Sequence, residues 1–169
     1  MRFEFATATR ILFGPGVVND AASAAVGLGC RALVACSPTA EQRLPLRQQF
    51  EAKGLATTLF GVRGEPTIDT VRAGLRCARE ARCDLVVGLG GGSALDAGKA
   101  IAALLVNGGD PLDYLEVIGR GRALLQPSAP YIAIPTTAGT GAEVTRNAVL
   151  ASPEHRVKAS FPSPFLFPR

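Results

Sequence analysis

Two stretches rich in glycine and in small hydroxyl side chains have the residue types that could bind a phosphate group. The first, "GLGGGSALD" at 88–96, follows an apolar run and precedes small residues with helical spacing. Glycines between a strand and a helix let a phosphate reach the free backbone N–H groups at the positive end of the helix dipole. Ser93 would cap this helix, and Asp96 three residues later completes a capping-box pattern. These residues favour a phosphate cradle, and a tight turn without a ligand is the alternative.

Two common phosphate-loop patterns do not fit this stretch. The dinucleotide pattern G-x-G-x-x-G would use Gly88 and Gly90, but Ser93 stands in place of its third glycine. A Walker A loop ending at Lys99 would need glycine at 93 and serine or threonine where the sequence has Ala100. The stretch therefore belongs to neither class of loop.

The second stretch is "PTTAGTGAEVT" at 135–145, which again follows an apolar strand pattern. In open α/β sheets, ligands bind beyond the carboxyl ends of the strands. Two such loops after two parallel strands could therefore face one crevice, and an ordinary threonine-rich turn is the alternative for the second loop.

The sequence shows no set of residues typical of a nucleophilic or metal-dependent catalyst. His155 is the only histidine and lies between Glu154 and Arg156, so we expect it in a surface turn. No Ser-His-Asp or Cys-His set and no histidine cluster can be assembled. The cysteines form no Cys-x-x-Cys pair and are expected to be buried or bystander thiols. They are Cys30, Cys36, Cys77 and Cys83.

Apolar strand patterns alternate with helical patterns along the chain, which predicts an α/β fold with a Rossmann-like parallel sheet flanked by helices. One or two edge strands are expected over 3–13. Strands are expected at 32–36, 57–60, 84–89 and 131–135, and helices at about 17–27, 40–53, 67–82 and 93–107. Pro45 should kink the helix at 40–53 or delay its start. The apolar end at 165–167 is typical of the approach to a strand, so we expect the chain to be part of a longer protein.

Length and composition predict one soluble domain over residues 1–169. No apolar run approaches the ~18 residues that span a membrane, and no export signal is visible, so a cytoplasmic location is expected. The net charge of +4 comes from scattered arginines. Arg72, Arg76, Arg79 and Arg82 recur at helical spacing, but they alternate with apolar residues and are expected on the solvated face of a helix. Nucleic-acid binding is therefore not predicted.

Five motifs together resemble the N-terminal half of the iron-containing (group III) alcohol dehydrogenase family. They are "RILFGPGVV", "EPTID", "GLGGGSALDAGKAIA", "AIPTTAGTGAEVTRNAVL" and "HRVKASFPSPFLFPR", and they cover nearly the whole chain. The resemblance implies an NAD(P)-binding α/β domain like the N-terminal domain of dehydroquinate synthase. It also implies hydride transfer between a nicotinamide and a small alcohol or carbonyl compound. Apolar surface left exposed where the family's helical domain docks would favour a homo-oligomer.

The resemblance also implies residue roles. Gly91, Gly92 and Ser93 would hold the pyrophosphate, with Asp96 near the cofactor. The adenine and phosphate side would be lined by Thr136, Thr137, Gly139 and Thr140, and Thr145 and Lys158 would lie toward the ribose and nicotinamide.

Two positions depart from the family pattern. Ser37 stands where many members carry an aspartate that binds the adenosine ribose, so we expect NADP to be tolerated better than usual. Glu65 stands where relatives often have asparagine, and its carboxylate could contact a ribose hydroxyl, which weakens the argument for NADP.

The family's metal site is a further difference. That site, for Fe²⁺ or Zn²⁺, takes one aspartate and three histidines from beyond the region present here, so no metal ligand is expected in this chain. The residues present would bind the cofactor weakly at best and catalyse nothing by themselves. A dehydroquinate synthase-like or glycerol-1-phosphate dehydrogenase-like enzyme, or a non-catalytic nucleotide-binding module, stays open.

Overall fold

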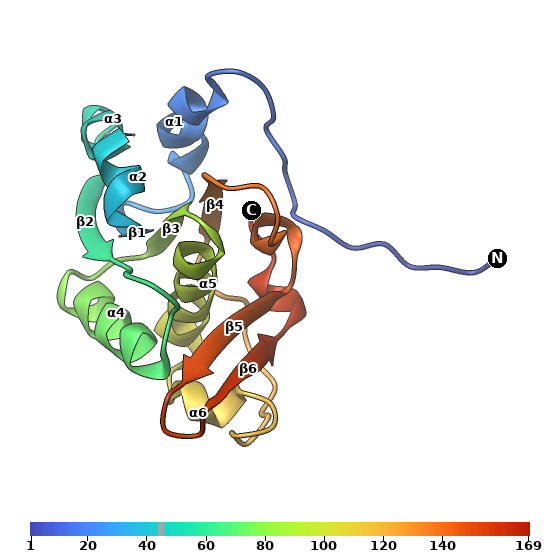
Figure 1. Cartoon of the computed structure of the whole chain (residues 1–169). Coiled ribbons are helices and arrows are strands. Elements are labelled where there is room, and N and C mark those ends of the chain that lie inside the picture. Colours follow the sequence, from blue (N-terminus) through green and yellow to red (C-terminus); the bar gives the residue numbers. More distant parts are fainter. Residues whose placement is uncertain (44–45) are drawn as a thin grey trace.

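A four-stranded parallel sheet in the order β2-β1-β3-β4 forms the centre of the computed structural model, which describes residues 1–43 and 46–169 (Figure 1). The strands are β1 (Arg31–Cys36), β2 (Ala56–Gly61), β3 (Leu85–Gly90) and β4 (Tyr131–Pro135). Every residue of β3 is buried, as expected for an apolar strand covered on both faces. The expected parallel α/β fold is confirmed.

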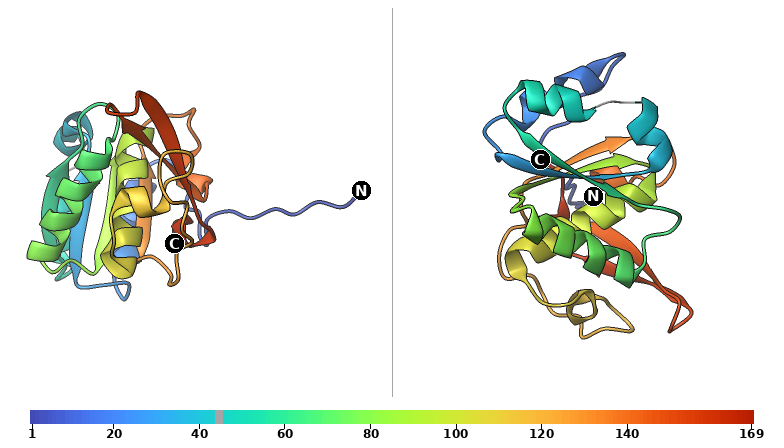
Figure 2. Two further views of the ribbon diagram at one scale, coloured as in Figure 1. Left: turned by 90° about the horizontal axis from the view of Figure 1, so that it is seen from below. Right: turned by 90° about the vertical axis from the view of Figure 1, so that its left-hand side faces the viewer.

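Helices cover both faces of this sheet (Figure 2). On one face lie η1 (Val17–Asp20), α1 (Ala21–Ala25), α2 (Pro38–Arg43) and α3 (Leu46–Ala52). On the other face lie α4 (Ile68–Glu80), α5 (Gly92–Asn107) and α6 (Pro111–Tyr114). Two hydrophobic clusters correspond to these two layers. The helix expected at 40–53 is therefore represented by α2 and α3, and Pro45 lies outside the described residues.

An antiparallel hairpin, which sequence patterns did not predict, packs beside α5. It consists of β5 (Asn147–Ser152) and β6 (Val157–Pro162). The N–H of Ala151 donates to the carbonyl of Pro66 over 2.8 Å, so the hairpin is also attached to the segment that precedes α4. Short 3-10 turns, η2 (Ala142–Val144) and η3 (Pro164–Leu166), flank it.

Neither end of the chain forms the strand that the sequence pattern suggests. Residues 3–13 form no strand, and residues 1–6 extend away from the body as an exposed arm (Figure 1). A strand needs a neighbouring edge to satisfy its backbone groups, and these residues meet none in the part of the chain described here. At the other end, Leu166 is buried within the 3-10 turn, and the N–H of Arg169 donates to the carbonyl of Tyr131.

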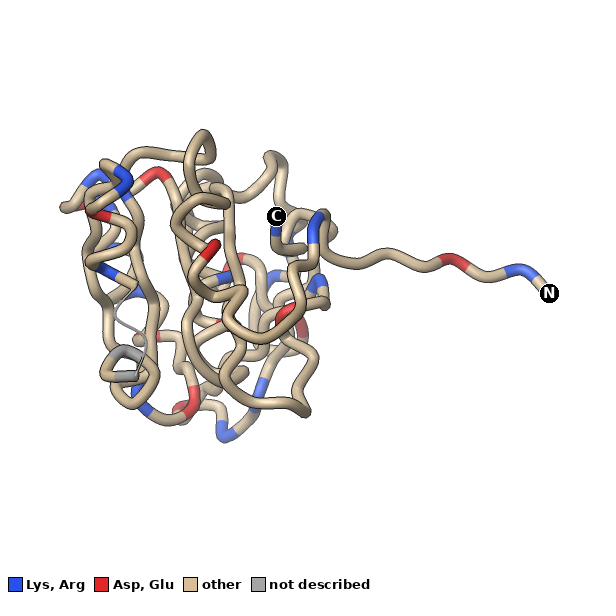
Figure 3. The backbone as a smooth tube through the Cα atoms, turned by 90° about the horizontal axis from the view of Figure 1, so that it is seen from above, with Lys and Arg blue, Asp and Glu red and all other residues tan. Residues whose placement is uncertain are grey.

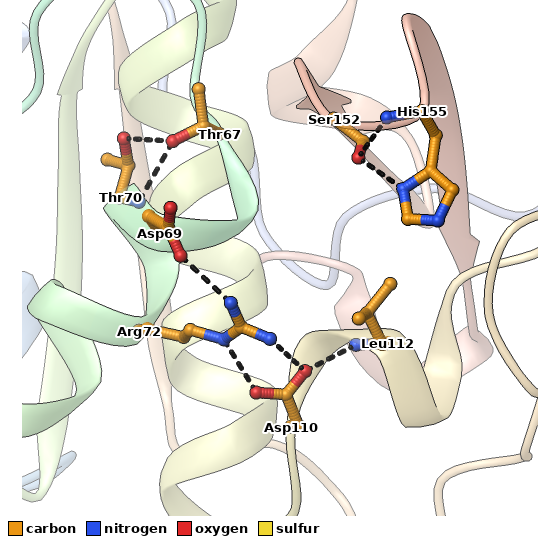
Figure 4. A network of polar contacts seen from close by, with 8 residues as sticks. All are labelled: Thr67, Asp69, Thr70, Arg72, Asp110, Leu112, Ser152 and His155. Atoms are coloured by element: carbon orange, nitrogen blue, oxygen red, sulfur yellow. Dashed lines mark hydrogen bonds and ion pairs between the residues drawn. The ribbon is translucent and has the colours of Figure 1, made fainter.

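Arg72 departs from the expected solvated stripe of arginines. Its guanidinium donates two hydrogen bonds to Asp110, of 2.7 and 2.9 Å, and one to Asp69 (Figure 4). These bonds raise the pKa of Arg72 and lower the pKa of Asp110, which is the N-cap residue of α6. Arg72 therefore connects α4 to α6. Arg82 also departs from the expectation, because α4 ends at Glu80.

Basic and acidic residues are distributed over many elements of the chain (Figure 3). None of the helices in the described part of the chain is both long and apolar enough to cross a membrane.

Tyr131 sets the distance between β3 and α5. Its ring is buried and its hydroxyl donates to the carbonyl of Leu95 over 2.9 Å. Gly88 on β3 and Gly98 on α5 both face this ring, and a Cβ atom at Gly98 would lie 2.8 Å from it. Both glycines are therefore needed for this close approach.

We predict that Gly88→Ala destabilises the chain, because the new methyl group would overlap the Tyr131 hydroxyl and lie 3.1 Å from Leu95. Overpacking of this kind costs about 2 kcal/mol in the free energy of unfolding. Urea unfolding at neutral pH measures the change. Gly61→Ala is the matched control, because nothing lies within 4 Å of its Cβ position. Equal stabilities of the two variants would contradict the assigned role of Gly88.

Candidate functional site

Helix α5 begins earlier in the sequence than the pattern predicts. Gly91 is the N-cap residue and no side chain caps the helix, so the expected capping by Ser93 and the capping box are wrong. Gly90 has a φ of +145°, which only glycine adopts without strain, and this turn starts the helix at Gly92. Within the described chain, the N–H groups of Gly92 and Ser93 have no acceptor. They are available to an anion.

The loop after β4 lies directly over this glycine turn. The N–H of Thr136 donates to the carbonyl of Gly90 over 2.9 Å. A Cβ atom at Gly91 would lie 3.3 Å from Thr137, and one at Gly92 would lie 2.9 Å from Thr140. The two loops therefore meet at the carboxyl edge of the sheet, as expected for loops that follow adjacent parallel strands.

A cavity of about 420 Å³ opens at this meeting point. Most of the residues expected to contact a cofactor line it, and the hairpin supplies much of the opposite wall. The expected residues that line it are Glu65, Gly92, Ser93, Asp96, Thr140, Thr145 and Lys158. The other lining residues are Pro66, Ala142, Asn147, Val149 and Ala151.

The remaining expected residues are not part of the cavity lining. They are Ser37, Gly91, Thr136, Thr137 and Gly139. Ser37 follows β1, and its hydroxyl accepts a hydrogen bond from the N–H of Ala40. It lies close to Gly90, whose Cβ position is 3.1 Å from the Ser37 hydroxyl. Ser37 is therefore next to the glycine turn that leads into α5.

An ion pair between Glu65 and Lys158 borders the cavity. Lys158 belongs to β6, and Glu65 belongs to the loop between β2 and α4. Both side chains are more than half exposed. Exposed pairs of this kind contribute little to stability, so either partner can exchange the other for a ligand at small cost.

Asp96, which lines the cavity, lies one helical turn before the buried Lys99 on α5. Burial raises the pKa of Asp96 to about 6, while Lys99 and the N–H of Val149 oppose the rise. Burial also lowers the pKa of Lys99 to about 8, against the influence of Asp96 and Glu143. Asp96 accepts a hydrogen bond of 3.2 Å from the Val149 N–H, so its carboxylate is directed to β5 and not to the N-cap.

Lys99 is the charged residue near this site that the sequence patterns missed, and the hairpin residues of the lining were missed with the hairpin itself. It is 1% exposed, within a helix whose neighbouring positions are small and apolar. A single lysine in such a run was the available signal, because a buried lysine requires partners.

His155 lies in a surface turn, as the sequence predicts, and the cysteines differ in exposure. His155 is exposed in the turn between β5 and β6, with Nδ1 2.8 Å from the Ser152 hydroxyl (Figure 4). Cys36 and Cys83 are buried, Cys77 is half-buried and Cys30 is exposed. Within residues 1–43 and 46–169, no group of three or more potential metal-ligating side chains occurs, so the residues described do not fit a metal ion.

We predict that Asp96 makes the stability of the chain depend on pH. The folded chain binds more protons than the unfolded chain between about pH 4 and 6, because burial raises the pKa of Asp96 from 3.8 to about 6. The free energy of unfolding should therefore fall as the pH rises through this window. Asp96→Asn should flatten this part of the curve, as measured by urea unfolding at stepped pH. Asp20→Asn, at an exposed carboxylate, should leave the slope unchanged, and a slope retained in Asp96→Asn would refute the assignment.

Two proteins of similar sequence match this chain over most of its length. Sulfoacetaldehyde reductase of Bilophila wadsworthia (strain 3_1_6) is 34% identical over 99% of this chain and 43% of the relative. The probable alcohol dehydrogenase EutG of Escherichia coli (strain K12) is 38% identical over 82% of this chain and 35% of the relative. The chain thus spans less than half the length of these proteins.

Solved structures give the same result. The crystal structure of a 1,3-propanediol oxidoreductase superposes with a TM-score of 0.88 at 30% identity, over 99% of this chain and 44% of that one. Sulfoacetaldehyde reductase from Bifidobacterium kashiwanohense, in complex with NAD⁺, gives 0.86 at 31% identity, over 99% and 45%. The family model described as iron-containing alcohol dehydrogenase matches residues 8–169. The chain therefore belongs to the iron-containing alcohol dehydrogenase family.

Proposed function

We propose that residues 1–169 form the NAD(P)-binding α/β domain of an oxidoreductase that interconverts a small alcohol and its aldehyde or ketone. The observation that carries the proposal is the cavity of about 420 Å³ at the uncapped N-terminus of α5, in a chain of this family. Its volume is within the range of ligand pockets, about 300–1,000 Å³. The names of the relatives, among them a sulfoacetaldehyde reductase and an alcohol dehydrogenase, support the reaction class.

The residues at the glycine turn fit the pyrophosphate of a dinucleotide. The N–H groups of Gly92 and Ser93 would donate to its oxygens at the positive end of the α5 dipole. Gly91 and Gly92 lack the side chains that would keep a phosphate away from this backbone. Thr140 adds a hydroxyl from the facing loop.

In this proposal, the rest of the cofactor would lie on either side of this turn. Thr136, Thr137 and Gly139 would border the adenine and phosphate side, and Thr145 and Lys158 would border the ribose and nicotinamide side. The bound nicotinamide supplies or accepts the hydride. The residues of this chain bind and orient the dinucleotide, and we assign no metal to them.

The function is tested by titrating the chain with NADH and following the nicotinamide fluorescence. We expect binding, and we expect Gly92→Val to weaken it about tenfold or more, because the added side chain would meet Thr140 and cover the helix N-terminus. Gly61→Ala, at a β2 residue that does not line the cavity, is the control and should bind like the unmodified chain.

The complete reaction is tested in a protein of full family length that carries this chain, by following NADH formation from small primary alcohols. NADH binding without any turnover would favour a non-catalytic nucleotide-binding module. Absence of NADH binding both in the chain and in that longer protein would contradict the proposed function.

We predict that Ser37→Asp weakens the binding of NADP relative to the binding of NAD. Ser37 lies beside the Gly90 turn, where a carboxylate would repel the 2′-phosphate of NADP and accept from the ribose hydroxyls of NAD. We expect the dissociation constant of NADPH to rise about tenfold relative to that of NADH. Ser37→Asn introduces a side chain of similar size without the charge. If Ser37→Asp leaves the ratio unchanged, or if the unmodified chain already strongly prefers NADH, Ser37 does not determine the preference.

A further inference from the structure

The buried ammonium of Lys99 uses all of its hydrogen atoms on one segment of the chain. It donates to the carbonyl of Thr145 over 2.8 Å, to the hydroxyl of Thr145 over 3.1 Å and to the carbonyl of Asn147 over 2.8 Å. These three bonds match the three donors of a lysine ammonium. Asp96 lies 4.0 Å away and contributes charge without a hydrogen bond.

This arrangement decides the direction of the Thr145 hydroxyl hydrogen. A hydroxyl has one hydrogen, and an ammonium cannot accept a hydrogen bond. The Thr145 oxygen therefore faces Lys99 as an acceptor, and its hydrogen must be directed elsewhere. In the described part of the chain no acceptor is found for this hydrogen, and Thr145 lines the cavity.

We infer that Lys99 is a positioning residue that holds the Thr145 hydroxyl as a hydrogen-bond donor toward a bound acceptor oxygen in the cavity. The inference rests on the proposed function, because it assigns the acceptor to the dinucleotide. Phosphate and ribose oxygens of the cofactor have the required chemistry. Lys99 itself touches no ligand, because it is buried beneath the wall that Thr145 and Asn147 form.

The donor should be lost when Lys99 loses its proton. A neutral amine has a lone pair that accepts from the Thr145 hydroxyl, which turns the hydrogen away from the cavity. Burial lowers the pKa of Lys99 to about 8, so this change lies within an accessible range of pH. The charged groups that face Lys99 are Asp96 on α5 and Glu143 on η2. The pKa of Asp96 is about 6, so Asp96 stays ionised through the range in which Lys99 titrates.

The experiment measures NADH affinity by fluorescence titration at intervals from about pH 7 to 9.5 in the unmodified chain, in Thr145→Val and in Thr145→Ser. We expect the unmodified chain to lose about tenfold in affinity as the pH rises through the pKa of Lys99 at about 8. Thr145→Val should bind weakly at pH 7 and show no further loss. Thr145→Ser retains a hydroxyl and should restore the affinity and the pH dependence.

Lys99→Met provides a second test, with Lys53→Met at an exposed lysine as its matched control. Thermal unfolding of each variant shows whether the fold persists. A folded Lys99→Met should show no pH dependence of NADH affinity, whereas Lys53→Met should behave like the unmodified chain. If Lys99→Met does not fold, the two Thr145 variants still decide the matter.

The outcomes separate this inference from the proposed function. NADH binding with the same pH profile in Thr145→Val and in the unmodified chain overturns the inference alone. A flat profile in the unmodified chain also overturns it. Absence of NADH binding at every pH, both in the chain and in the protein of full family length, overturns the proposed function, and the inference with it.

Discussion

Burial of one charge, the ammonium of Lys99, fixes the position of α5 relative to the segment that leads into β5. A buried ammonium is costly unless all its hydrogens are bonded, and here every acceptor comes from Thr145 and Asn147. Removal of these acceptors while Lys99 stays buried would leave an uncompensated charge, at a cost of about 3–5 kcal/mol. The second attachment, from the Val149 N–H to Asp96, lies one helical turn away. α5 and β5 therefore form a single support for the cavity.

The pairing register of the β5–β6 hairpin fixes which residues face the other side of the cavity. Ala151 on β5 is paired with Lys158 on β6, and both line the cavity. Side chains alternate between the two faces of a strand, so a slip of one residue would turn Lys158 to the opposite face. Glu65 then meets Lys158 because the N–H of Ala151 binds the carbonyl of Pro66, the residue next to Glu65. The position of the Glu65–Lys158 pair thus follows from backbone pairing and not from the attraction between the two charges.

The parts of the fold that sequence predicts are those with a strong local pattern. β3 is a continuous apolar run, and the parallel sheet follows from its alternation with helices. The hairpin was missed because polar residues interrupt the apolar pattern of β5 and β6, and because β5 packs against α5, an element distant in the sequence. Residues 3–13 were expected to form a strand and do not, because an alternating pattern alone does not form a strand where no partner edge is present. Among the site residues, the loops were predictable and Lys99 was not, because its partners are 46 to 48 residues away.

A tight turn and a phosphate cradle are not exclusive descriptions of the stretch that follows β3. Gly90 is needed for the turn, because its φ of +145° is accessible only to glycine. Gly92 is needed for contact with the second loop, because Thr140 occupies the space of its missing side chain. The turn places the start of α5 at Gly92 and not at Ser93, and no side chain caps it. The same geometry that closes the turn therefore leaves free N–H groups at the start of α5, so the structural role of these glycines and the phosphate-binding role proposed for them depend on one backbone conformation.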